Sequence, residues 1–322
     1  MGSFDEKNIE RIEALLEEIL GEEEFERRLE LAEELLEIAP EDPLANYIKW
    51  QSLDDEESEE RVSMLKEAVE ILEEGLEGED IEELDETIRS FYSSMLSDLA
   101  SHFYFKGEKE EALAVARRFM QVDVDCYIIG RLVYYAVLIE RGSPESYAEV
   151  VNAADSDICE TPIAAHSRAI ALYETEGANE EASDALLEAV SMDPDMVFYI
   201  LGLWTFEDRE DEEADPMEGL DEEMEDLLLH IAVLSELWGA SEERLAFLGV
   251  VAFAFGYMTG RMESTGDIDM IEEGYKGLGC LEEMREARDT VHSLIASGKE
   301  PEEIDEEALM MFRDMWDKGL FS

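Results

Sequence analysis

The segment from Ala185 to Trp204 constrains the fold most, because one helical run stops within it and another apolar run follows at once. The first run ends at Met192, two residues before Pro194. A proline cannot continue the hydrogen-bond ladder of a preceding helix, but it suits the first turn of the next one. The segment therefore predicts a junction between two consecutive helices.

Stops of the same kind divide the chain upstream of this junction. An apolar helix from residue 164 ends at Gly177, and glycine closes helices because it tolerates the left-handed backbone conformation. A new helix starts at residues 178–182 and runs to Val190. Paired apolar runs at residues 44–53 and 61–76, and at 127–141 and 145–154, predict two further hairpins. Abundant Glu, Leu, Ala and Met with only 7 Pro favour an all-α chain.

The hairpin that ends at Pro194 resembles the tetratricopeptide repeat, a helical hairpin of about 34 residues. Four residues match the pattern positions of that family: Tyr173, Ala182, Ala189 and Pro194. A second copy is similar at Leu99, Ala100, Phe103, Gly107, Ala112 and Ala116. A third copy ends at residues 35–40 and is followed by Pro43, which opens the next helix.

The resemblance extends over about residues 8–200 and implies an all-α, right-handed superhelical solenoid of about five hairpins. Neighbouring hairpins must stack, because the apolar face of one hairpin is too wide for that hairpin to bury alone. In tetratricopeptide arrays the first helix of each hairpin lines a concave groove. The resemblance therefore implies that this groove holds a segment of another protein.

The last third of the chain departs from the repeat pattern. Residues 207–216 form a charge run that ends in a proline and predicts a solvated, mobile loop. Helices are expected after it at residues 222–238, 242–262, 269–297 and 302–318. Gly249, Gly256 and Gly260 lie on the second of these helices, where each costs up to ~1 kcal/mol relative to alanine. We expect close packing against another helix to compensate for that cost.

These patterns predict three regions: a tetratricopeptide-like array at residues 1–204, an acidic loop at 205–221, and a C-terminal helical bundle at 222–322 that caps the array. Residues 193–202 and 237–247 also resemble the C-terminal part of the suppressor-of-tumorigenicity family of repeat proteins. That second resemblance implies a non-enzymatic protein.

The net charge of −62, from 86 acidic and 24 basic residues, excludes several classes of partner. Nucleic acids and anionic membrane surfaces would be repelled, because their phosphates need positive charge to bind. Two explanations of the acidity remain open. One is adaptation of the whole proteome to molar salt, which the even spread of acids and the small number of lysines favour. The other is a basic partner, or mimicry of a polyanion.

The sequence predicts a protein of the cytoplasm. Its first residues carry no apolar stretch behind a basic flank, as a signal peptide would. The most apolar segment, residues 245–258, is shorter than the ~20 residues of a membrane span and predicts a buried core helix. The cysteines at positions 126, 159 and 280 are odd in number and provide no disulfide framework, which favours a reducing compartment.

No motif predicts catalysis, a metal or a cofactor. The histidines, at positions 102, 166, 230 and 292, do not pair at helical spacing. Asp289 and His292 share a helix face, but a di-iron bundle needs two Glu-x-x-His elements and two further glutamates. Residues 274–279 are glycine-rich but lack the Gly-Lys-Ser/Thr ending of a phosphate loop, and they predict a helix break. We expect a non-enzymatic protein.

The expected groove-lining helices carry aromatic, basic and serine side chains. The predicted partner-binding residues are Tyr47, Trp50, Arg89, Tyr92, Ser94, Ser97, Ser101, Arg131, Tyr134, Tyr135, His166 and Arg168. An arginine can bind a carboxylate of an acidic peptide through two parallel hydrogen bonds. The alternatives are that each arginine pairs with a neighbouring acid and that the aromatics belong to the core. The serines could form a polar floor for a peptide or permit a tight helix crossing.

Two functional hypotheses follow. The first is an interaction scaffold or chaperone-like adaptor that binds a protein segment in the groove. The second is an acidic shield for basic proteins, such as histone-type or ribosomal cargo, or a polyanion mimic. The second predicts binding that weakens steeply as salt is added.

Overall fold

The structure is a computed structural model, and it describes residues 6–22, 24–53, 59–76, 84–123, 125–205, 222–262 and 268–321. Regular secondary structure in these ranges is entirely α-helical and comprises sixteen helices, α1 to α16. The predicted all-α class is therefore confirmed for them. The predicted acidic loop lies outside the described residues, apart from residue 205.

The chain forms two compact units, which are residues 1–137 and 138–322. Each unit is described separately below. The predicted division into an array at residues 1–204 and a bundle at 222–322 stays a prediction, as does the superhelical solenoid.

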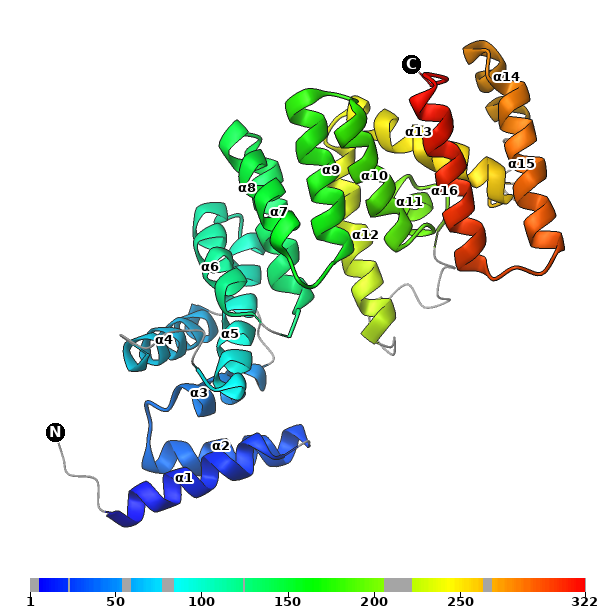
Figure 1. Cartoon of the computed structure of the whole chain (residues 1–322). Helices are drawn as coiled ribbons and strands as arrows, with labels where there is room; N and C mark the ends of the chain where they lie inside the picture. The colour runs from blue at the N-terminus through cyan, green and yellow to red at the C-terminus, as the bar shows by residue number, and fades with distance from the viewer. Residues whose placement is uncertain are drawn as a thin grey trace. The chain divides into compact units, whose positions relative to one another are not determined.

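In the first unit, consecutive helices contact one another from α1 through α6 (Figure 1). Its helices are α1 (Glu6–Leu20), α2 (Phe25–Ile38), α3 (Pro43–Gln51), α4 (Glu59–Gly75), α5 (Glu86–Phe105), α6 (Lys109–Val122) and most of α7 (Ile128–Arg141). Buried apolar residues recur every three or four positions, as in Leu15 and Ile19 on α1 and Leu31 and Leu35 on α2. That spacing gives each helix one apolar face, and these faces form the core.

Local capping residues fix where α3 begins and where α5 ends. The Asp42 carboxylate accepts the backbone N–H of Ala45 at 2.9 Å, and Pro43 occupies the first turn of α3. Helix α5 ends before Gly107, which has a φ of 76°. That end leaves the last turn of α5 accessible, with the Phe105 side chain 80% exposed.

The second unit contains the remaining helices. They are α8 (Pro144–Ser156), α9 (Pro162–Glu176), α10 (Glu180–Met192), α11 (Met196–Ile200), α12 (Glu222–Gly239), α13 (Glu242–Thr259), α14 (Ile268–Leu278), α15 (Leu281–Ala296) and α16 (Pro301–Asp317). The predicted stops at Gly177 and before Pro194 are confirmed. Pro194, however, precedes α11 instead of lying within it, and the Asp193 carboxylate accepts the N–H of Met196 at 3.2 Å.

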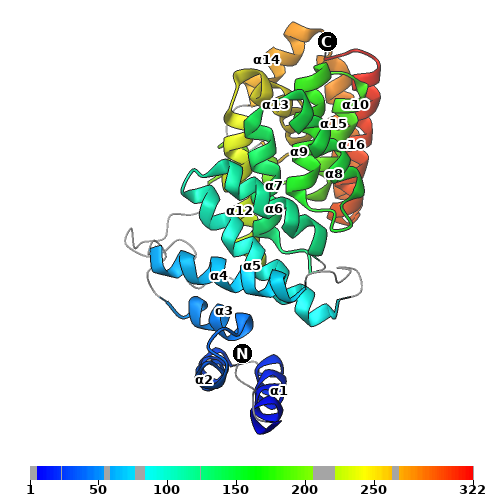
Figure 2. The ribbon, with the colours of Figure 1, turned by 90° about the vertical axis from the view of Figure 1, so that its left-hand side faces the viewer.

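The C-terminal helices pack onto the hairpin of α9 and α10. Helix α12 contacts α9 (Figure 1), and α16 contacts α10 (Figure 2). The indole N–H of the buried Trp238 on α12 donates to Nδ1 of His166 on α9 at 3.2 Å. Helix α13 contacts α11, α12, α14, α15 and α16, and so forms the centre of the C-terminal helices.

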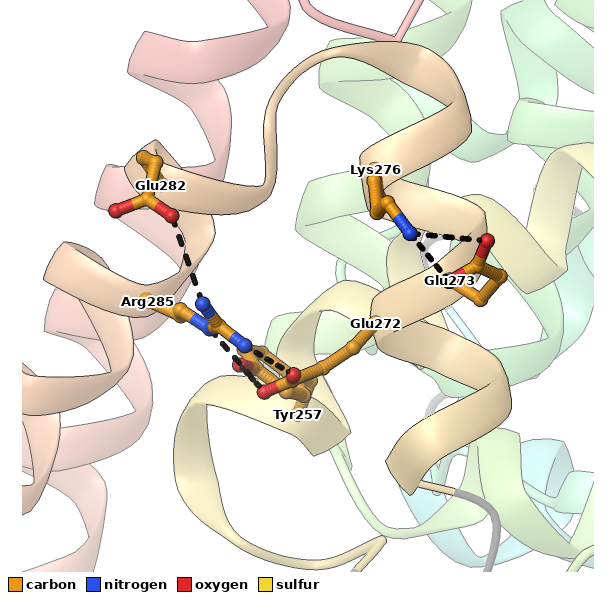
Figure 3. A network of polar contacts seen from close by, with 6 residues as sticks. All are labelled: Tyr257, Glu272, Glu273, Lys276, Glu282 and Arg285. Carbon is orange, nitrogen blue, oxygen red and sulfur yellow. Dashed lines mark hydrogen bonds and ion pairs between the residues drawn. The ribbon is translucent and has the colours of Figure 1, made fainter.

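Helices α14 and α15 replace the single helix predicted over residues 269–297. The break falls at Gly279, which has a φ of 80°, and the helix break predicted for residues 274–279 is therefore confirmed. A polar network links α13, α14 and α15 across this break (Figure 3). Glu272 accepts hydrogen bonds from the Tyr257 hydroxyl at 2.8 Å and from the Arg285 guanidinium at 2.5 Å.

Of the three glycines predicted on one helix, Gly249 and Gly256 lie within α13 and Gly260 directly follows it. A Cβ on Gly256 would lie 2.6 Å from Cγ of Met262 and 2.8 Å from Cε1 of Phe198, so this glycine allows the predicted close packing. Gly260 ends the helix with a φ of 81°. The nearest neighbour of a Cβ on Gly249 is Phe253 of the same helix at 3.4 Å, so the expected interhelical packing is absent there.

No described helix is both long and apolar enough to cross a membrane. Cys280 is a buried free thiol, whereas Cys126 and Cys159 are each disulfide-bonded. The prediction that the cysteines provide no disulfide framework is therefore wrong for Cys126 and Cys159, and it no longer supports a reducing compartment.

Candidate functional site

The first unit contains a pocket of about 520 Å³ formed by α3, α4 and the C-terminal end of α5. We call it the α3–α5 pocket. Its lining residues are Trp50, Arg61, Asp98, Ser101, His102, Phe105 and Lys106. Trp50 and Ser101 were among the predicted partner-binding residues. The pocket therefore brings part of the predicted set to one place.

Basic side chains are concentrated at this pocket. Arg61, His102 and Lys106 are three of its seven lining residues, although the whole chain has only 24 Lys and Arg against 86 acids. A smaller adjacent pocket shares His102 and Lys106 and adds Lys66, whose ammonium lies 4.5 Å from the centre of the Phe103 ring. Arg61 and Lys106 are thus two cations against one acid, Asp98, in the α3–α5 pocket, which is a local surplus of positive charge on a strongly acidic protein.

Aromatic rings hold the cationic groups in place. The guanidinium carbon of Arg61 lies 4.4 Å from the centre of the Trp50 ring, which is a favourable cation–π geometry. Trp50 in turn stacks on Tyr47, with ring centres 5.6 Å apart and planes 12° apart. Because stacking on Tyr47 fixes the Trp50 ring, the Arg61 guanidinium is already in position before a ligand binds.

A hydrogen-bonded group forms the inner side of the pocket. The hydroxyl of buried Tyr47 donates to Oδ2 of Asp98 at 2.7 Å and lies 2.7 Å from Oγ of Ser94. Burial raises the pKa of Asp98 to about 6, although the Tyr47 hydrogen bond and the Arg61 charge act against this rise. Burial also lowers the pKa of His102, as does Lys106. Asp98 therefore gains or loses its charge at about pH 6.

Four serines of α5, at positions 90, 94, 97 and 101, recur at spacings of four, three and four and so share one helix face, which has mixed surroundings. Ser94 contacts Tyr47, and Ser101 lines the pocket, which matches the polar floor predicted for a peptide. Ser97 is buried, as expected for a tight helix crossing, and Ser90 lies 3.2 Å from the Tyr127 hydroxyl. Each of the two interpretations of this face thus describes some of its members.

The other predicted residues of the first unit do not line the pocket. Tyr92 is buried and donates to Glu73 at 2.5 Å. Arg131 is also buried, pairs with Asp123 at 2.5 Å and lies over the Phe119 ring. Arg89 is partly buried on α5, and Tyr134 and Tyr135 are buried on α7 in an edge-to-face pair. These contacts correspond to the alternative interpretation of internal pairing and core packing.

His166 and Arg168 belong to the second unit. His166 is completely buried, and burial lowers its pKa to about 3. Arg168 is partly exposed and pairs with Asp155 at 2.7 Å. Both residues therefore make contacts inside their own unit.

Five residues of the pocket were missed in the sequence: Arg61, Asp98, His102, Phe105 and Lys106. The groove prediction considered only the first helix of each hairpin, whereas Arg61 lies on a second helix and Lys106 follows the end of α5. The sequence did contain a signal for the basic residues of this pocket. Three bases and a histidine occur at positions 61, 66, 102 and 106 on paired helices of a chain that has few bases.

Among the described residues, no group of histidine, cysteine and acidic side chains could hold a metal ion. Comparison with known proteins finds no protein-family model that matches the chain. No curated protein matches it, and no solved structure matches it. The tetratricopeptide resemblance stays a prediction, and the α3–α5 pocket is the feature from which function can be argued.

Proposed function

We propose that the protein is a non-enzymatic interaction scaffold, or chaperone-like adaptor, of the tetratricopeptide type. It binds a segment of another protein in the α3–α5 pocket. The observation that carries this proposal is the gathering of Arg61, His102 and Lys106 beside Trp50 and Phe105. The segment that fits this chemistry has carboxylates for the basic groups and an apolar or aromatic side chain for the exposed Phe105 ring.

The global charge of the protein affects this binding in a specific way. An acidic segment is repelled at long range by the acidic surface and attracted at short range inside the pocket. Salt at 0.15 M screens exposed charges beyond about 8 Å, and molar salt beyond about 3 Å, while contacts in a partly closed pocket are screened less. We therefore expect the affinity for an acidic segment to persist or increase as salt is added.

The test uses two labelled ten-residue peptides. One alternates Glu or Asp with Leu and Trp, and the other has Gln and Asn at the acidic positions. Fluorescence anisotropy is measured from 0.15 to 2 M KCl with the wild type, with Arg61→Gln and with Arg27→Gln. Arg27 is an exposed arginine of the same unit, is paired with Glu30 and lies outside the pocket.

Binding of the acidic peptide is expected to fall about tenfold in Arg61→Gln, which corresponds to about 1.4 kcal/mol. Arg27→Gln should bind like the wild type. The proposal fails if neither peptide binds, if both bind equally, or if the two variants lose affinity equally.

The net charge of −62 favours a second candidate, the acidic shield for basic proteins. The same measurement separates the two functions when a Lys-rich peptide of equal length is added. A shield predicts that the basic peptide binds tightly at 0.15 M KCl, loses affinity steeply toward 2 M, and does not respond to Arg61→Gln.

A further inference from the structure

The second unit contains a larger cleft of about 730 Å³ between α10 and α16. We call it the α10–α16 cleft. Its apolar part is made of Leu187 and Met192 from α10 and Leu309 and Met310 from α16. Met192 is 37% exposed and Met310 is 50% exposed, so the cleft presents apolar surface to solvent. Methionine is flexible and polarizable, and it adapts to apolar partners of different shapes.

Carboxylates line both walls of this apolar surface. Asp184 and Glu188 are four positions apart on α10, and Glu302, Asp305 and Glu306 share one side of α16. Residues three or four apart lie on the same face of a helix. A segment in the cleft would therefore meet apolar contacts in the middle and negative charge on both sides.

Three of these acids already pair with arginines: Asp305 with Arg261 at 2.8 Å, Glu188 with Arg168 at 3.7 Å, and Asp184 with Arg313. Only the last pair joins the two walls of the cleft. Arg313 of α16 donates from Nη2 to Oδ2 of Asp184 on α10 at 2.7 Å, so this ion pair spans the cleft. Its guanidinium-bearing side chain is 55% exposed. Exposed ion pairs of this kind contribute little to stability and are easily exchanged. A cation of a partner can thus replace Arg313 beside Asp184.

We propose that the α10–α16 cleft is a docking site for an amphipathic helix of a partner protein, with an apolar face flanked by Lys and Arg. The apolar face packs on the two leucines and two methionines. The basic residues pair with Glu302, with Glu306 and, in exchange with Arg313, with Asp184. The negative charge of the cleft favours a basic partner helix over the other possible occupants. A second copy of this chain, with a net charge of −62, would be repelled by the carboxylates of the cleft, and so would nucleic acid.

A basic peptide is attracted to any acidic protein, so the test must separate docking from diffuse attraction. The probe is a labelled 14-residue helical peptide of Leu and Lys, with Leu at spacings of three and four. The matched peptide has Ser in place of Leu and the same charge. Binding is measured by fluorescence anisotropy at 0.15 and 0.5 M KCl. The Leu-containing peptide is expected to bind at least tenfold more tightly.

Two pairs of variants locate the site. Met310→Gln should weaken binding of the Leu-containing peptide about tenfold, whereas Met270→Gln changes an exposed methionine outside the cleft and should have no effect. Arg313→Ala should strengthen binding severalfold, because it frees Asp184 and removes a competing cation. Arg285→Ala changes the net charge equally, removes a comparably exposed arginine paired with Glu272, and should leave the affinity within about twofold of the wild type.

The proposal is overturned if the two peptides bind equally, or if Arg313→Ala and Arg285→Ala have the same effect, since either result means diffuse attraction only. It is also overturned if Met270→Gln weakens binding and Met310→Gln does not, because the peptide would then occupy another surface.

Discussion

At the scale of single residues, Asp98 links the α3–α5 pocket to pH. Its carboxyl has a pKa of about 6, so it is ionised at pH 7.5 and mostly protonated at pH 5.5. The negative charge present at pH 7.5 opposes an acidic ligand, and protonation removes it. The acidic peptide should therefore bind severalfold more tightly to the wild type at pH 5.5, as measured by anisotropy at both pH values.

Asp98→Asn provides the control for this pH effect, because asparagine still accepts the Tyr47 hydrogen bond. The variant should bind more tightly than the wild type at pH 7.5, and its affinity should change less between the two pH values than that of the wild type. An unchanged pH profile in Asp98→Asn would show that another group is responsible.

His166 gives a pH dependence of stability. Its pKa in the folded protein is about 3, whereas the unfolded chain takes up the proton near pH 6.5. The unfolded state therefore binds more protons between these values, and the contribution of His166 to stability is lost as the pH falls below 6.5. At pH 5 the loss is about 2 kcal/mol.

His166→Gln retains an acceptor for the Trp238 N–H and cannot titrate. Urea unfolding at pH 7.5 and 5.0 should show that the wild type loses about 2 kcal/mol more than this variant between the two pH values. Comparing the two proteins cancels the titration of the many carboxylates. Equal losses would mean that His166 titrates normally in the folded protein.

Two glycines of the second unit form a matched pair for testing helix packing. Gly256→Ala places a methyl group 2.6 Å from Met262 and 2.8 Å from Phe198, and should destabilise the protein by about 1–3 kcal/mol. Gly274 lies inside α14, and a Cβ added there would meet no neighbouring group within 4 Å, so Gly274→Ala should stabilise by up to ~1 kcal/mol. Opposite shifts of the urea midpoint are expected, and shifts of the same sign would contradict this packing.

At the scale of helices, Arg244 joins four elements of the second unit. It lies in the first turn of α13 and is 8% exposed. Its guanidinium donates to Glu174 on α9 at 2.5 Å, to the backbone carbonyl of Leu237 on α12 at 2.9 Å and to the Tyr147 hydroxyl on α8 at 3.3 Å. One side chain therefore satisfies acceptors from three other helices.

Arg244→Gln should lower the free energy of unfolding by about 3 kcal/mol, because it removes a buried ion pair and leaves acceptors without donors. Arg313→Gln removes an exposed pair and should cost less than about 1 kcal/mol. Denaturant titration of both variants checks the contrast, and a similar cost for the two would show that the Arg244 contacts are not important for stability.

The helices were largely predictable from the sequence, because their signals are local. Gly177 and Pro194 stop helices through their own backbone chemistry, whatever surrounds them. The contacts of Trp238 with His166 and of Arg244 with Glu174 join residues 72 and 70 positions apart, and no local pattern encodes them. Only part of the pocket was predicted, for the same reason. Trp50 has a recognisable helical spacing, whereas the position of Arg61 over its ring depends on how α4 packs.

At the scale of the whole molecule, the surplus of acids over bases opposes folding, because the native state brings like charges together. Added salt screens this repulsion. Melting temperatures measured by circular dichroism should therefore rise by several degrees between 0.1 and 2 M KCl.

The control for this salt effect is a variant with glutamine at five exposed glutamates of the first unit: Glu17, Glu33, Glu67, Glu70 and Glu111. Its melting temperature should be higher than that of the wild type at 0.1 M KCl and should rise less with salt. An equal gain in both proteins would indicate that salt acts through apolar burial instead of charge screening.

The ion pair of Asp184 with Arg313 has a consequence for biosynthesis, because its two residues are 129 positions apart in the chain. Ribosomes add about 5–20 residues per second, so α10 leaves the ribosome on the order of ten seconds before α16 does. During that interval the nascent chain has α10 without the helix that later covers it. The surface of α10 that α16 contacts in the folded chain is uncovered during that time, and transiently exposed apolar surface makes such nascent chains prone to aggregation.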